Sequence, residues 1–262
     1  MSYETIIFEI TNGVAWVTLN RPDRLNAITD LMLKELNLVL DQVEADEEVR
    51  CLVLTGSGRA FCPGQDLNDR AVSGSGPRDL GETVGNGYNP FLRRFYNLAV
   101  PTIAAVNGVA AGAGANIALA CDIVVAADVA KFIQVYSNIG LVPDAGGSFI
   151  LPRLIGLAKA KELTFTARPV KADEAQNIGM IAHCVKADEL IEFTAELAEG
   201  LAIKPTMGLA KTKVALHASH SNTLDEQLDL ERDLMRECGY SDDYAEGVAA
   251  FLEKRKPVFK GH

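Results

Sequence analysis

The fold is decided by residues 106–122, VNGVAAGAGANIALACD. An apolar strand leads through the turn Asn107-Gly108 into a loop of glycine and alanine, and a helix follows. Because no bulky side chain covers this backbone, N–H groups at the start of the helix are accessible to a negatively charged group. Small residues also let a helix pack closely on a sheet, so the stretch by itself is consistent with either purpose.

A similar organisation occurs earlier in the chain. Residues 51–54 predict a short buried strand, and residues 56–67, GSGRAFCPGQDL, form a second glycine-bearing loop before a helical segment. The repeat is one of organisation and not of sequence. Residues 71–87 are rich in glycine and predict a long loop, of the kind that often serves as a lid.

Composition excludes several classes of protein. The chain has 262 residues, 48% of them hydrophobic, and a formal net charge of -10, which does not suit non-specific binding to nucleic acid or to an anionic membrane. Five scattered cysteines without a C-x-x-C pair indicate free thiols in a reducing compartment. Because the first residues do not read as a signal peptide and no apolar run would span a bilayer, we expect a cytoplasmic protein.

The order of predicted elements indicates an α/β body followed by a helical tail. A hairpin is predicted from two β-rich runs, 5–10 and 14–19, and a helix capped by Thr29 follows. Further strands are expected at 102–106, 123–126, 132–135 and 182–185. Helical patterns cover 88–98, 146–161 (interrupted at Pro152 and Gly156), 187–202, 205–219, 222–239 and 242–253. We expect the tail to dock on the body or on another subunit.

Six short motifs, in order and at fitting spacing, resemble the crotonase (enoyl-CoA hydratase/isomerase) superfamily. They lie at Arg21–Ala27, Gly58–Leu67, Asn107–Asp122, Ala130–Phe132, Gly140–Arg153 and Glu246–Phe251. The resemblance covers nearly the whole chain. It implies an α/β fold, a spiral of ββα turns over residues 1–200, followed by a helical trimerisation region over residues 201–262.

The resemblance also implies an acyl-CoA thioester as substrate. By position in the motifs, the thioester oxygen accepts hydrogen bonds from the backbone N–H groups of Gln65 and Ala113. Fixed donors at this oxygen stabilise charge that develops only in the transition state, and losing one typically costs about 10²–10³ in rate. No metal or separate cofactor is implied, because CoA enters as part of the substrate.

The acid–base residue implied by the resemblance is Asp144, within GLVPDAGG at residues 140–147. Hydratases of the family carry two glutamates, whose positions fall at Asn116 and Tyr136, so no carboxylate is present there to activate water. One carboxylate suits a proton shift between carbon atoms, because it can both remove and return the proton. The alternative is that Asp144 caps the helix that begins near Gly146.

Ten further residues fall at positions that meet the CoA moiety or the acyl group in the family. They are Arg24, Leu25, Ala27, Ala60, Gly64, Asp66, Leu67, Asn116, Tyr136 and Lys254. Lys254 would reach a phosphate from the C-terminal helix, either of its own chain or of a neighbouring subunit. The alternatives are a solvated surface charge for Arg24 and Lys254, a bond to helix backbone for Asn116, and core packing for Tyr136.

Within the family, the chain looks most like the isomerases of bacterial aerobic phenylacetate degradation, on the basis of Tyr88–Arg94, Leu230–Asp233 and Tyr244–Phe259. These convert 2-(1,2-epoxy-1,2-dihydrophenyl)acetyl-CoA to oxepin-CoA and move a double bond from 3-enoyl-CoA to 2-enoyl-CoA. We therefore predict an acyl-CoA isomerase that forms a homotrimer or a dimer of trimers. The alternatives are enoyl-CoA hydration or another crotonase reaction, and an acyl-CoA-binding scaffold without catalysis.

Overall fold

The first two strands form the predicted hairpin. In the computed structural model, which describes residues 3–67 and 79–262, β1 (Ile6–Thr11) pairs antiparallel with β2 (Val14–Leu19). The turn residues Asn12 and Gly13 have φ of 53° and 75°. This left-handed pair matches the twist of a two-residue hairpin, which explains why Asn-Gly occurs here.

The hairpin begins a six-stranded sheet that is otherwise parallel. Its order is β1-β2-β3-β5-β7-β10, with β3 (Cys51–Gly56), β5 (Thr102–Val106), β7 (Ile123–Ala127) and β10 (His183–Val185). All residues of β3 are buried. Leu52 and Leu54 belong to the hydrophobic cluster on one face, while Cys51 and Val53 belong to the cluster on the other. This is the alternation expected of a strand covered on both faces.

Three strands of this sheet are each followed by a short strand of a second sheet. The second sheet has the order β4-β6-β8-β9, with β4 (Ala60–Cys62), β6 (Val109–Ala111), β8 (Lys131–Ile133) and β9 (Val170–Lys171). Thus β3 leads to β4, β5 to β6, and β7 to β8, in three successive turns of a spiral. The predicted crotonase-like α/β fold is confirmed.

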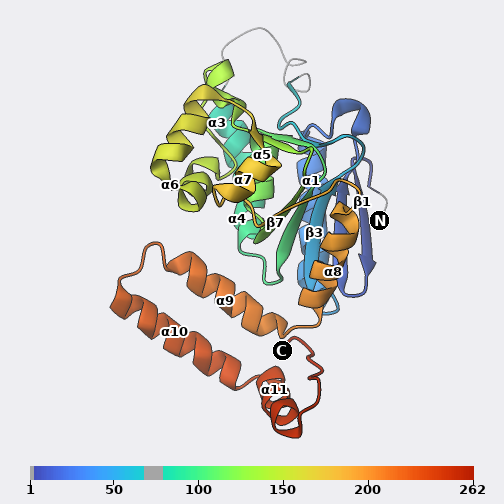
Figure 1. Ribbon diagram of the computed structural model, residues 1–262, viewed down its shortest axis with the longest axis vertical. Helices are drawn as coiled ribbons and strands as arrows, with labels where there is room; N and C mark the ends of the chain where they lie inside the picture. The colour runs from blue at the N-terminus through green and yellow to red at the C-terminus, as the bar shows by residue number, and fades with distance from the viewer. Residues whose placement is uncertain (1–2, 68–78) are drawn as a thin grey trace.

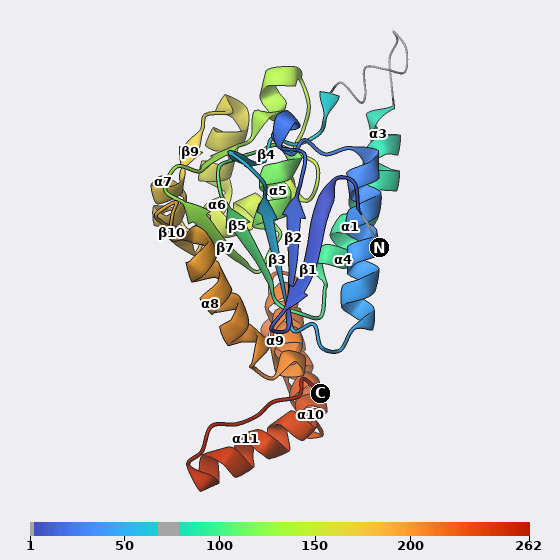
Figure 2. The same ribbon diagram turned by 90° about the vertical axis from the view of Figure 1, so that its right-hand side faces the viewer.

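Helices cover both faces of the large sheet (Figure 2). One face carries α1 (Asp30–Ala45), α4 (Asn89–Tyr96) and α5 (Ala113–Leu119), and the other carries α8 (Leu190–Ala202). Shorter elements complete the body: η1 (Pro22–Arg24), α3 (Leu80–Thr83), a π-helical turn η2 (Val84–Tyr88), η3 (Val135–Ile139) and α7 (Ala172–Asn177). The helix α6 (Gly147–Thr166) breaks at Gly156, as predicted.

Two expectations about local structure are corrected. The predicted loop over residues 71–87 is helical from Leu80 onward, and residues 71–78 lie outside the described part of the chain. The strand expected at 132–135 ends at Ile133, because Val135 already begins the 3-10 turn η3. Apolar spacing in such short segments does not separate a strand from a helical turn.

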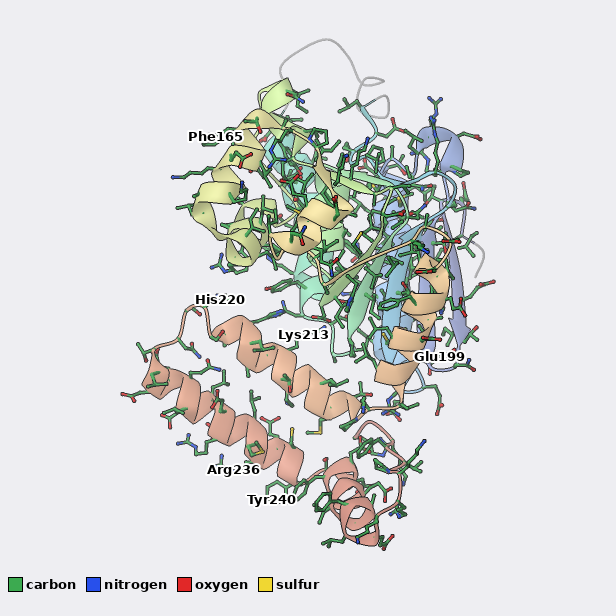
Figure 3. All side chains as sticks on the ribbon, in the orientation of Figure 1. Phe165, Glu199, Lys213, His220, Arg236 and Tyr240 are labelled. Atoms are coloured by element: carbon green, nitrogen blue, oxygen red, sulfur yellow. The ribbon has the colours of Figure 1, made fainter. Side chains whose placement is uncertain are left out.

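The last three helices form an arm that stands away from the body (Figure 1): α9 (Thr206–Ala218), α10 (Leu224–Gly239) and α11 (Asp242–Glu253). Figure 3 shows Lys213 reaching from α9 toward the body, whereas Arg236 and Tyr240 lie at the far side of the arm. None of the residues of α10 is buried. Over the described ranges, the protein has no helix with the length and apolar character needed to cross a membrane.

Candidate active site

Two backbone turns meet at the ends of neighbouring strands. Strands β4 and β6 are parallel neighbours, so the turn after β4, which holds Gln65, lies beside the turn after β6, which leads into Ala113. Gly64 has a φ of 99°, and a Cβ placed on it would lie 3.1 Å from the Ala111 carbonyl oxygen and 3.4 Å from the Ala113 nitrogen. Only glycine allows both the left-handed backbone and this close approach.

The N–H groups of Gln65 and Ala113 have no acceptor among the described residues. Ala113 is the first residue of α5, where a helix leaves its N–H groups without an internal partner. Gln65 lies between two bonds to Ile28: the Ile28 N–H donates to the Gly64 oxygen and the Asp66 N–H donates to the Ile28 oxygen, both at 2.8 Å. The Gln65 N–H therefore faces away from the Ile28 segment, as an oxyanion donor must.

Close packing is also a function of the glycine-alanine stretch. A Cβ on Gly114 would lie 2.3 Å from the Cys62 carbonyl oxygen, so α5 contacts β4 directly through glycine. The packing interpretation of the stretch is therefore confirmed, and the anion-binding interpretation stays a prediction. The two are compatible, because the contact that needs small residues is the one that brings the two turns side by side.

Asp144 lies half-buried between η3 and α6. Its Oδ1 accepts a hydrogen bond of 2.6 Å from the Tyr136 hydroxyl. The N-cap of α6 is Gly146, without a side-chain capping bond, so the alternative that the Asp144 carboxylate caps this helix is wrong. The Asp144 carbonyl oxygen, and not its side chain, accepts the Gly147 N–H at 2.9 Å.

Asn116 joins Asp144 to the helix that carries Ala113. It is fully buried, one turn after Ala113 in α5, and its Nδ2 donates to the Tyr136 hydroxyl at 2.9 Å and to the Asp144 carbonyl at 2.8 Å. A Cβ placed on Gly112 would lie 3.9 Å from Tyr136 Cζ. Through these contacts the carboxylate is held beside the turn that presents the Ala113 N–H.

Burial governs the ionisation of the neighbouring groups. Burial, and next the negative charge of Asp144, raises the pKa of the Tyr136 hydroxyl well above its ordinary value. Tyr136 therefore remains a hydrogen-bond donor. Burial also raises the pKa of the Cys62 thiol to about 12, so this cysteine, although near Gly64, is not a nucleophile at neutral pH.

The segment of the first motif lies against β4. Asn26 is buried, and its Nδ2 donates to the Ala60 carbonyl at 2.8 Å. This bond brings Ala27 close to Ala60, and both residues are buried. The predicted CoA contacts require that the two lie in the same region. Leu25 is half-buried with a φ of 54°, and Arg24 is exposed at the end of η1. Their contact with CoA stays a prediction.

The acidic residue of the second motif has a structural partner. Asp66 is buried and forms an ion pair of 3.0 Å with Arg21, which ties the first motif to the second. Leu67 beside it is 59% exposed. The Gln65 side chain accepts a hydrogen bond of 2.6 Å from the Tyr88 hydroxyl, a contact that fixes the residue whose N–H we assign to the oxyanion hole.

Lys254 is not brought to this site within one chain. It is exposed and ends α11 in a left-handed conformation with a φ of 56°, and α11 and α5 lie at opposite ends of the molecule (Figures 1 and 2). A contact between Lys254 and a CoA phosphate therefore requires another subunit, and it stays a prediction.

Sequence reasoning missed the contribution of Gln134. It is 5% exposed, and its Nε2 donates to Asn116 Oδ1 at 2.8 Å. The available signal was a polar residue among apolar ones after Phe132, but its partner is 18 residues away in α5, and sequence alone does not reveal that pairing.

Comparisons with known proteins place this geometry in a family. The sequence profile of the enoyl-CoA hydratase/isomerase family matches residues 9–262. A 1,2-epoxyphenylacetyl-CoA isomerase of Escherichia coli K12 is 51% identical over 259 residues, covering 98% of this chain and 99% of that one. A probable enoyl-CoA hydratase of Rhodobacter capsulatus is 46% identical over 261 residues, all of both chains. The crystal structure of an enoyl-CoA hydratase from Bacillus anthracis has a TM-score of 0.93 at 33% identity, over 99% of this chain and 100% of that one.

Proposed function

Since the chain belongs to the enoyl-CoA hydratase/isomerase family, the crotonase superfamily, we propose that it is an isomerase that shifts a double bond within a CoA thioester. It is an enzyme of that superfamily, whose members named above include both isomerases and hydratases. The proposal assigns acid–base catalysis to Asp144 and the oxyanion hole to the backbone N–H groups of Gln65 and Ala113.

The proposed reaction moves one proton. The thioester carbonyl accepts hydrogen bonds from the N–H groups of Gln65 and Ala113, which stabilise the negative charge of the enolate. Asp144 removes a proton from the carbon next to the carbonyl of a 3-enoyl-CoA, and the electron pair spreads over the conjugated dienolate. The same carboxyl group returns the proton two carbons further along, which yields the 2-enoyl-CoA with no gain or loss of atoms.

One observation carries the proposal: the carboxylate at this site is Asp144, and the two hydratase glutamate positions hold groups that bind it. Asn116 contacts the Asp144 carbonyl and Tyr136 contacts its carboxylate. A hydratase needs a carboxylate that activates water, whereas an amide and a phenol with a raised pKa do not do so. A proton shift between carbons needs only one such group.

The isomerase of Escherichia coli supports a more specific substrate. At 51% identity over nearly the whole chain, it favours 2-(1,2-epoxy-1,2-dihydrophenyl)acetyl-CoA, converted to oxepin-CoA, as a further substrate, and hence a role in phenylacetate catabolism. Opening of the epoxide and expansion of the ring rearrange the same set of atoms, so this reaction is also an isomerisation.

Hydration is the second candidate, because the relative of Rhodobacter capsulatus is a probable enoyl-CoA hydratase at 46% identity. This candidate requires a water activated by a group other than the two family glutamates. It predicts rapid conversion of crotonyl-CoA to 3-hydroxybutyryl-CoA, which the isomerase hypothesis does not.

The test compares the wild type with Asp144→Asn on a 3-enoyl-CoA and on the epoxide substrate. We expect kcat to fall by about 10²–10⁴ on both, because the amide neither accepts nor returns the proton. Because the protonated Asp144 carboxyl exchanges with solvent between removal and return of the proton, solvent deuterium should enter the product of the wild type and not that of the variant. Asp188→Asn, at an exposed position in the connection to α8, is the control and should keep full activity.

Two outcomes would overturn the assignment. Fast hydration of crotonyl-CoA that survives Asp144→Ala would make the protein a hydratase. Binding of thioesters with neither deuterium exchange nor movement of the double bond would leave only an acyl-CoA-binding scaffold.

The proposal extends to assembly and cofactors. We propose a homotrimer or a dimer of trimers, supported by the family and by the arm that leaves the body. CoA enters as part of the substrate, and the proton transfer proposed above uses side-chain and backbone groups alone. The scattered cysteines, all free among the described residues, support a reducing compartment such as the cytoplasm.

A further inference from the structure

A row of buried side chains leads to the Asp144 carboxylate. Gln134 Nε2 donates to Asn116 Oδ1 at 2.8 Å, Asn116 Nδ2 donates to the Tyr136 oxygen at 2.9 Å, and the Tyr136 hydroxyl donates to Asp144 Oδ1 at 2.6 Å. Gln134, Asn116 and Tyr136 are each 5% exposed or less. Bonds between polar groups so deeply buried are costly to break, so these three bonds favour one geometry. Gln134 Oε1 is buried without a hydrogen-bond partner among the described residues.

The direction of these bonds is fixed by Asn116. Its Nδ2 faces two acceptors, the Tyr136 oxygen and the Asp144 carbonyl, while its Oδ1 faces the Gln134 amide N–H. A reversed amide would set Oδ1 against the Asp144 carbonyl oxygen and two N–H groups against each other. Since Tyr136 accepts from Asn116, its own proton is directed to Asp144.

We propose that Tyr136 is a positioning residue for the Asp144 carboxylate, and that Asn116 and Gln134 hold Tyr136 in the orientation that donates to Oδ1. This inference rests on the proposed acid–base role of Asp144. The hydroxyl restrains the rotation of the carboxylate, and thereby the angle at which the carboxylate meets the substrate carbon.

The hydroxyl also acts on the charge of the carboxylate. A hydrogen bond donated to a carboxylate is stronger than one donated to the neutral acid, so it favours the ionised form that accepts a proton. Tyr136 itself keeps its proton because burial raises its pKa. Among the described residues, the other titratable group that acts on Tyr136 is Tyr88, whose hydroxyl donates to Gln65 Oε1.

The test removes only the hydroxyl, in Tyr136→Phe, and follows a 3-enoyl-CoA across pH. We expect kcat to fall by about 10- to 100-fold, the usual effect of a hydrogen bond to a charged group, with little change in KM. The acid limb of kcat/KM should move to higher pH by about one unit or more, because the carboxylate loses a donor. Tyr96→Phe is the matched control, since Tyr96 is half-buried and stacks on His217 of α9, away from Asp144, and it should change neither quantity.

A second variant tests the fixed direction of the bonds. Gln134→Met keeps an unbranched side chain of similar length but removes the donor to Asn116. The Asn116 amide then keeps its bonds to Tyr136 and to the Asp144 carbonyl but loses the third contact that holds it, so we expect the acid limb to move in the same direction as in Tyr136→Phe, by a smaller amount.

The outcomes separate this inference from the proposed function. If Asp144→Asn abolishes turnover while Tyr136→Phe and Gln134→Met leave kcat and the acid limb unchanged, Tyr136 does not position the carboxylate. If kcat of Tyr136→Phe falls while the acid limb stays in place, Tyr136 acts only through packing, and the proposed positioning role is wrong. If Asp144→Asn is itself fully active, the acid–base assignment fails first.

Discussion

At the scale of single residues, the site depends on backbone geometry more than on side chains. Gly64 is the clearest case, because its φ of 99° and its contacts of 3.1 Å and 3.4 Å with the Ala111 oxygen and the Ala113 nitrogen exclude any larger residue. The side chains of Gln65 and Ala113 therefore carry little information about their proposed role, which belongs to their N–H groups.

The role of Ala113 is testable with proline. Ala113 is the first residue of α5, a position where proline fits the helix and merely removes an N–H group. We expect Ala113→Pro to lower kcat/KM for a 3-enoyl-CoA by about 10²–10³ while the fold is retained, as circular dichroism would check. Ala113→Ser keeps the N–H and serves as the control. Full turnover by a folded Ala113→Pro protein would exclude Ala113 as an oxyanion donor.

Much of the candidate site was accessible from sequence because its parts lie in local motifs. Gln65, Ala113 and Asp144 each stand in a glycine-bearing segment whose spacing is recognisable. Gln134 and the bond between Tyr88 and Gln65 were not foreseen, since Asn116, the partner of Gln134, lies in another turn of the spiral and Tyr88 is 23 residues from Gln65. Pairings between distant segments depend on the sheet register, which local spacing does not specify.

At the scale of elements, the sequence predicted the long helices well and the short strands poorly. The four helices of the C-terminal region were predicted within a few residues of their ends, because each carries a long helical pattern. The structure shows Thr223 and Ser241 as the N-caps of two of them. The second sheet was not predicted as a sheet. Its strands have two or three residues each and are stabilised by their neighbours, so their own sequence carries too little periodicity.

The attachment of α9 to the body gives an element-scale prediction. Lys213 Nζ donates to the Leu98 and Val100 carbonyls at 2.9 Å and pairs with Asp122 at 2.6 Å. Removing this charge takes the Lys213 donor from the two carbonyls and leaves Asp122, among the described residues, with its bonds to Thr102 alone, so we expect Lys213→Met to lower the free energy of unfolding by about 2–3 kcal/mol. Urea denaturation would measure it.

The matched control is Lys186→Met, because Lys186 has a side chain that is 73% exposed. We expect its effect to stay within about 0.5 kcal/mol. Equal stability of the two variants would show that the Lys213 contacts do not hold α9 to the body.

At the scale of the whole molecule, no described residue of the arm belongs to either hydrophobic cluster of its own chain. Both hydrophobic clusters, taken over the described residues, end by Ala202. The arm instead exposes large apolar side chains, among them Met235 at 72%, Phe251 at 82% and Leu252 at 74%. An exposed apolar surface of this kind is typical of a subunit interface.

The proposed assembly is therefore testable by sedimentation velocity. We expect a trimer or a hexamer at micromolar concentration, because apolar side chains on the arm gain by leaving water. Phe251→Asp should favour smaller species, since it would place a charge in the interface. Arg236→Asp, which also changes charge but at a residue with a 56% exposed side chain on the outer arm, is the comparison. A monomer of the wild type at all concentrations would contradict the proposed assembly.

Because the arm is separate from the core, the stability of the protein should depend on its concentration. If α10 and α11 are covered only by other copies, dilution removes that cover and leaves the body as the folded unit. The temperature of unfolding would then rise with protein concentration. A dilute sample would lose the arm first and any CoA contact that another subunit supplies, even though Asp144 and the two N–H groups stay in place within each chain.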